Sequence, residues 1–111
     1  MKQTYGHVIE IDGEYKDAIL TPEPSVAWDY AKKHHGARGS RTGPPDVNRG
    51  WEWLAYGYPV LIHAAPVVDL DGESAFAIRS EGFLTKIVLA NTLEEAKEFG
   101  SVRPVNLVRP L

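Results

Sequence analysis

The chain has 111 residues, of which 43% are hydrophobic and 24% charged, with no cysteine and a formal net charge of −3. This composition predicts a single globular domain over residues 1–111, and it excludes disulfides, thiolate metal sites and cysteine nucleophiles. No apolar run approaches the ~20 residues that cross a bilayer, and the N-terminal sequence lacks an apolar signal region. We therefore expect a cytoplasmic protein that makes no membrane contact.

A β-hairpin is expected at the start of the chain. Residues 4–11 and 14–20 alternate apolar side chains at period two, and Asp12-Gly13 lies between them. Both turn residues tolerate positive φ, which is typical of a two-residue hairpin turn. The sequence therefore predicts two antiparallel strands at these ranges.

A helix is predicted over residues 26–35. The preceding TPEPS ends the second strand because proline cannot donate to a strand ladder. Ser25 is placed to cap the helix, and Gly36 is placed to end it in the left-handed conformation. The basic residues of the last turn, which include Lys33, lie where the free carbonyl groups of a helix favour positive charge.

The next stretch, residues 36–50, differs from the rest of the chain. It has no apolar periodicity, and six of its residues are glycine or proline. A connection of this length without secondary structure is uncommon inside a compact domain, and we expect it to be functional or mobile. Residues 51–58 are rich in aromatic side chains, which favours a short strand or an irregular segment there.

Three strands are predicted in the second half of the chain, at residues 59–70, 74–80 and 83–90. The first is apolar on both faces, which is typical of a well-covered strand. Asp71-Gly72 and Glu81-Gly82 supply turns between them. We expect the three strands to form an antiparallel meander.

The chain then predicts a short helix and a final strand. Thr92 and Glu95 have the spacing of a capping box, so we expect a helix from residue 93 to 99. The tail at residues 102–110 is expected to add an edge strand, since its two prolines discourage further pairing. An edge strand leaves both a monomer and a sheet-to-sheet homodimer open.

The predicted fold class is therefore α+β. We expect an antiparallel sheet of about five or six strands, made of the N-terminal hairpin and the C-terminal meander, with two helices packed on one face. No internal repeat is evident in the sequence.

The charge distribution suggests where a partner would bind. Residues 32–49 carry five basic residues against one aspartate, a formal charge of +4, so that the remaining chain carries −7 to give the total of −3. Arginine beside clustered tryptophan and tyrosine is typical of interface hot spots. The predicted binding residues are Lys33, Arg38, Arg41, Arg49, Trp51, Trp53 and Tyr56.

These residues predict a small non-enzymatic binding module that engages a macromolecular partner through the 36–50 segment and its aromatic flanks. The glycine-spaced arginines of GARGSRTG suit simple anion contact. We expect a protein partner first and a nucleic acid second, since a basic segment on an acidic body does not favour broad nucleic-acid coating. The composition would also suit an accessory or mobile-element (phage-like) regulator.

The alternative hypothesis is a small metal-independent ribonuclease. In it, His34 or His35 would act with His63 as acid and base, while the arginines of the 36–50 segment stabilise the developing charge. No metal or other cofactor is expected, because adjacent histidines on a helix diverge and the i, i+4 spacing of helical zinc ligands is missing.

Overall fold

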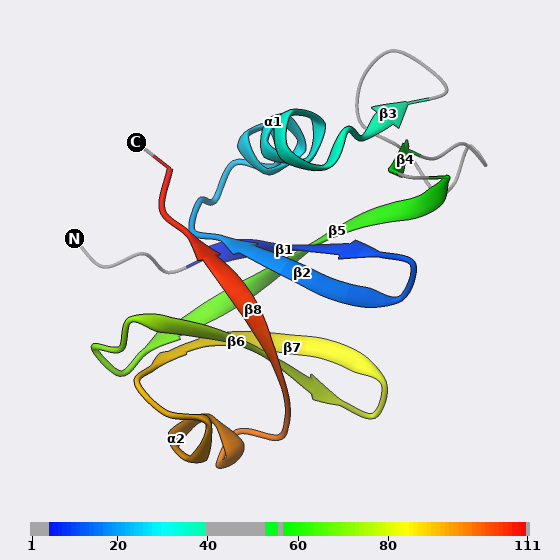
Figure 1. Ribbon diagram of the computed structural model, residues 1–111. Coiled ribbons are helices and arrows are strands. Elements are labelled where there is room, and N and C mark those ends of the chain that lie inside the picture. The colour runs from blue at the N-terminus through cyan, green and yellow to red at the C-terminus, as the bar shows by residue number, and fades with distance from the viewer. Residues whose placement is uncertain (1–4, 40–52, 56, 111) are drawn as a thin grey trace.

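Figure 1 shows the computed structural model of the chain, in which residues 5–39, 53–55 and 57–110 are described. The elements are β1 (Tyr5–Ile11), β2 (Glu14–Ile19), α1 (Pro24–His35), β3 (Arg38–Gly39), β4 (Trp53–Ala55), β5 (Tyr58–Asp69), β6 (Ser74–Ser80), β7 (Phe83–Ala90), α2 (Leu93–Lys97) and β8 (Ser101–Val108).

Six of these strands close into a barrel. The hydrogen-bonded order is β1-β2-β8-β6-β7-β5, and β5 pairs with β1 to complete the ring. The pairings β2–β8 and β5–β7 are parallel, whereas the other four are antiparallel, so the barrel is mixed. The short strands β4 and β3 extend from the start of β5 outside the ring.

Strands β5 and β8 each serve two neighbours in succession. Residues 60–66 of β5 pair with β1 and residues 67–69 pair with β7. In the same way, residues 101–105 of β8 pair with β6 and residues 106–108 pair with β2. These two strands therefore join the two hairpins into one closed surface.

The two halves of the barrel are related by a pseudo-two-fold rotation about the barrel axis. Shifting each strand three places round the ring exchanges β1, β2 and β5 with β6, β7 and β8 and keeps every pairing parallel or antiparallel as before. The two hairpins match at an offset of 69 residues, the difference between Asp12 and Glu81, and even their register shifts coincide. The topology therefore repeats a β-β-α-β unit.

The barrel interior and the two helices bury three separate apolar clusters. The interior cluster draws on all six ring strands and on neither helix, with Val8, Ile87 and Leu89 among its best-buried members. A second cluster lies under α1 and includes Trp28, and a third lies under α2 and includes Phe76. In Figure 1 the two helices lie at opposite sides of the barrel.

The predicted fold class is therefore wrong. The protein is a closed, mixed β-barrel with two short helices of 12 and 5 residues, and not an open antiparallel α+β sheet with both helices on one face. The reason is that strands such as β6 bury both faces, one in the barrel and the other under a helix. A sheet with a single covered face does not account for these continuous apolar runs.

The expected strand pairing is also partly wrong. The hairpins β1–β2 and β6–β7 form as predicted, on turns in which Asp12 and Glu81 have φ of 53° and 54°. However, β5 does not pair with β6 in a meander, because it runs parallel to β7. Likewise β8 is not an edge strand, because it lies between β6 and β2. The reason for expecting a sheet-to-sheet dimer at this strand is therefore removed.

The ends of the two helices show which of the predicted capping residues were correct. Gly36 ends α1 with φ of 67°, and Thr92 and Glu95 form the predicted capping box of α2. Ser25 does not cap α1, because the helix begins one residue earlier with Pro24 at its first position. Proline suits that position, where its missing N–H costs no hydrogen bond.

Neither helix is long and apolar enough to span a membrane, as far as the described residues 5–39, 53–55 and 57–110 extend.

Removing residues 101–111 should abolish cooperative folding. Without β8 the ring opens, β2 and β6 each lose a partner, and the interior loses Val105 and Leu107. We expect thermal unfolding followed by circular dichroism to show no cooperative transition for this variant. Deleting only residues 109–111 should keep the transition within a few degrees of the full chain. A cooperative transition in the longer deletion would contradict the closed barrel.

Candidate functional site

A pocket among the described residues lies at the end of the barrel that carries the turns Asp12-Gly13 and Glu81-Gly82, which we call the mouth. The pocket has a volume of about 490 Å³ and opens to solvent on one side. Both hairpins line it, with Glu10 and Tyr15 from the first and Arg79 and Phe83 from the second, and β5 contributes His63. Its volume lies within the range of small-molecule sites.

A β-bulge directs Tyr15 into this pocket. Ile9 pairs with Asp17 but Glu10 pairs with Tyr15, so the register shifts at Lys16, which is the extra residue of the bulge. One extra residue reverses the alternation of side chains along the strand. Tyr15 therefore faces the barrel interior, and Asp17 faces the opposite side of the sheet, towards α1. The β6–β7 hairpin has the same shift, which turns Leu84 inward.

The pocket contains a histidine–carboxylate pair. The Nε2–H of His63 donates to Oε1 of Glu10 at 2.8 Å, with side chains 35% and 20% exposed. The ring of Tyr15 stands edge-on to His63, with centroids 6.1 Å apart and planes at 75°. This arrangement holds the imidazole in one orientation and leaves its Nδ1 without a role in the pair.

Arg79 supplies the cationic side of the pocket. Its Nη2 donates to the carbonyl oxygen of Gly82 at 3.0 Å, and its guanidinium carbon lies 5.7 Å from the centroid of the Tyr15 ring. Its Nε is buried and has no hydrogen-bond partner in the structure as described. A buried donor without an acceptor costs about 1–3 kcal/mol, more when it is charged.

Burial raises the pKa of the Tyr15 phenol, and the nearby Glu10 carboxylate raises it further, while Arg79 and Arg103 act in the opposite direction. At neutral pH the phenol is therefore protonated, and it can donate a hydrogen bond.

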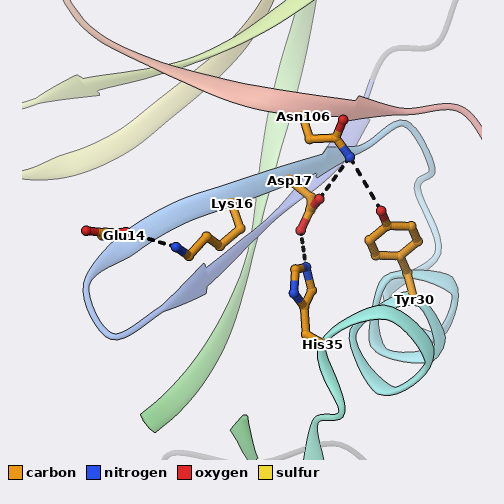
Figure 2. A network of polar contacts seen from close by, with 6 residues as sticks. All are labelled: Glu14, Lys16, Asp17, Tyr30, His35 and Asn106. Atoms are coloured by element: carbon orange, nitrogen blue, oxygen red, sulfur yellow. Dashed lines mark hydrogen bonds and ion pairs between the residues drawn. The ribbon is translucent and has the colours of Figure 1, made fainter. Parts of the chain in front are cut away.

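A second polar cluster lies on the other face of β2, where α1 meets the barrel (Figure 2). Asp17 is 5% exposed and accepts from Nε2 of His35 at 2.5 Å and from Nδ2 of Asn106 at 3.1 Å. The same Nδ2 lies 3.4 Å from the hydroxyl of Tyr30. One carboxylate thus joins α1, β2 and β8, because Asp17 and Asn106 are also register partners.

The Tyr30 ring completes this contact at the end of α1. It stacks on His34 with centroids 4.1 Å apart and meets His35 edge-on at 6.0 Å. Burial raises the pKa of the Tyr30 phenol, and the charge of Asp17 raises it further. Since Gly36 follows directly, the cluster sets the position from which the 36–50 segment departs.

The predicted binding residues are described only in part. Lys33 and Arg38 are exposed, and neither has a carboxylate partner in the part of the chain that the structure describes. Trp53 belongs to β4, where its backbone pairs with Gly39. The remaining predicted binding residues, Arg41, Arg49, Trp51 and Tyr56, lie outside the described residues.

The three histidines of the nuclease hypothesis have different surroundings. His63 faces the barrel mouth and pairs with Glu10, whereas His35 pairs with Asp17 on the face covered by α1, and His34 is exposed beside Tyr30. The contacts of the described residues do not bring His63 together with His34 or His35. Across these residues there is also no cluster of three His, Asp or Glu side chains that could hold a metal ion.

Sequence reasoning missed Glu10, Tyr15 and Arg79 as site residues. Each lies within two residues of an acidic-Gly turn, and the two turns were recognised. The missing information was that both turns lie at one end of a closed barrel and that a bulge reverses the side-chain alternation of β2. The repeated turn at an offset of 69 residues was the available signal.

Comparison with known proteins finds no relative. No protein-family model matches the chain, and neither a curated protein nor a solved structure is significantly similar to it.

The Asp17–His35 contact should contribute measurably to stability. We expect Asp17→Asn to lower the free energy of unfolding by about 2–3 kcal/mol, because it removes the charge that accepts two buried hydrogen bonds. In a double-mutant cycle with His35→Gln, the coupling energy should be about 1–3 kcal/mol, measured by urea denaturation. Strictly additive effects would show that the two side chains do not interact in solution.

Proposed function

We propose that this protein is a non-enzymatic binding module that contacts a protein partner with the barrel mouth and the adjoining 36–50 segment. The observation that carries the proposal is a row of exposed residues across three strands, Arg38, Leu54 and Pro59, which we call the rim row. These residues are register partners in β3, β4 and β5, so their side chains share one face of the sheet.

The chemistry of this end of the molecule suits an interface. Leu54 is 40% exposed, and Phe83 at the mouth is 75% exposed. The guanidinium of Arg38 is exposed without an ion-pair partner in the described part of the chain. Interface centres are enriched in arginine and aromatic side chains, and an exposed apolar side chain gains most when a partner covers it.

The base of the 36–50 segment is held close to the mouth. The pairing of β3 with β4 places residues 38–39 beside residues 53–54, and β4 pairs in turn with the start of β5. The backbone N–H of Asp12, in the first turn, donates to the carbonyl oxygen of Pro59 at 3.2 Å. A partner that binds the basic segment would therefore also meet the rim row.

The uneven distribution of formal charge along the chain suggests how a partner would approach. Residues 32–49 carry a formal charge of +4 and the rest of the chain −7. Separated charges of opposite sign steer an approaching partner and raise the association rate more than the affinity. We therefore expect a partner with an acidic contact surface, and binding that weakens with salt.

A matched pair of substitutions tests this function. Leu54→Asp in the rim row should reduce recovery of a partner from lysate of the source organism at least about tenfold. Leu70→Asp is the control, because Leu70 is 39% exposed but follows β5 at the opposite end of the barrel. Recovery is measured by quantitative mass spectrometry after nuclease treatment, with a melting temperature for each variant.

Equal recovery with both variants, at unchanged melting temperatures, would contradict a contact through the rim row. Loss of all captured protein after nuclease treatment would instead indicate that the partner is a nucleic acid.

A second candidate function is metal-independent cleavage of RNA at the mouth. The observation that favours it is the Glu10–His63 pair, which orients an imidazole in an open pocket beside the cationic Arg79. A histidine of this kind can act as general base while an arginine stabilises developing charge on phosphate.

If this second function holds, RNA incubated with the protein in excess chelator should be cleaved, and His63→Ala should lower the rate at least about a hundredfold. His34→Ala serves as the control, because His34 is exposed on α1 away from the pocket. Intact RNA in gel electrophoresis with the unmodified protein would end this proposal.

A further inference from the structure

The pseudo-two-fold axis places opposite charges at equivalent positions of the mouth. The offset of 69 residues relates Glu10 to Arg79, and both line the pocket. The two side chains make no ion pair with each other in the described structure, because Glu10 pairs with His63 and Arg79 bonds to the carbonyl of Gly82. The pocket thus has an acidic side and a basic side.

Each of these charged groups retains capacity for a ligand. Glu10 accepts from His63 through Oε1, and its second carboxylate oxygen is free of such a bond in the described structure. A guanidinium has five N–H donors, and the described structure shows one of those on Arg79 in use, from Nη2 to the carbonyl oxygen of Gly82. A carboxylate presents planar oxygen pairs that match this donor set.

The remainder of the lining is apolar or aromatic. Phe83 and Leu84 contribute from the second hairpin, and Ile62 and Ala64 from β5. In addition, the described residues supply no strand partner for residues 61–66 of β5 on the side away from β1, where the described pairing with β4 ends at residue 60 and that with β7 begins at residue 67. Unpaired backbone groups of a strand can fix the orientation of a bound molecule.

We propose that the mouth pocket binds a small zwitterion with an apolar side chain, of the α-amino acid class. The carboxylate of the ligand would accept from Arg79, its ammonium group would donate to Glu10, and its side chain would lie against Phe83 and Leu84. The pocket shares the mouth and Phe83 with the partner contact proposed above, but binding of the zwitterion does not require that partner.

The experiment titrates the full-length protein with L-phenylalanine and follows the side-chain Nε–H signal of Arg79 by NMR. We expect a saturable shift with a dissociation constant on the order of 1 mM. Two probes lack one charge each: 3-phenylpropionate has no ammonium group and phenethylamine has no carboxylate. Each should bind at least about tenfold more weakly, since one side of the pocket is left without a partner.

Substitutions of Arg79 and Glu10 test whether these two side chains bind the charged groups of the ligand. Arg79→Gln and Glu10→Gln should each weaken L-phenylalanine binding at least about tenfold, followed by backbone amide shifts at the mouth. Arg109→Gln changes the net charge as Arg79→Gln does, on an exposed residue beyond β8, and should leave binding unchanged. Phe83→Ser alters only an exposed side chain and should also weaken binding, which keeps the test valid if Arg79→Gln does not fold.

Several results would overturn the proposal. The first is the absence of any shift at the mouth up to about 20 mM L-phenylalanine. The others are equal affinity for L-phenylalanine and 3-phenylpropionate, and unchanged binding in both Arg79→Gln and Glu10→Gln.

Discussion

Barrel closure in this protein depends on two strands that change partners halfway along their length. β5 passes from β1 to β7, and β8 passes from β6 to β2. Each hairpin alone would have two open edges, and a two-stranded hairpin has little stability in water. The exchange of β5 and β8 between the halves removes these edges and encloses the interior cluster, and the two helices then cover the outer faces of opposite halves.

The same closure creates the mouth and its chemistry. Both acidic-Gly turns lie at one end of the ring, and identical register shifts direct Tyr15 and Leu84 inward. Because the backbone repeats while the side chains differ, equivalent positions carry unlike groups, such as Glu10 and Arg79. A scaffold with two-fold symmetry thus presents a pocket with two different sides. Strand β3, within the 36–50 segment, is joined to this end of the barrel through β4 and the start of β5. There the carbonyl oxygen of Pro59 accepts from the backbone N–H of Asp12 in the first turn.

Much of the local structure could be predicted from the sequence. The turns at Asp12 and Glu81, the capping box of Thr92 and the left-handed Gly36 depend on a few neighbouring residues, and all four form as expected. The candidate site could be predicted far less well. The basic segment was expected to bind, yet most of its predicted residues lie outside the described part, and the pocket residues Glu10, Tyr15 and Arg79 went unnoticed. Their proximity results from pairing between strands distant in the sequence.

By itself, the sequence determined the two hairpin turns, the capping box of α2 and the end of α1 at Gly36, because turn conformations and caps act over a few residues. Only the tertiary structure decided which strands are neighbours, since parallel pairs such as β5–β7 leave no short-range signal. It also decided which face each side chain occupies beyond a bulge, where one extra residue in β2 directs Tyr15 to the pocket and Asp17 to α1. The free energy that selects these pairings comes from burying the interior of the whole ring at once, and no single segment encodes it.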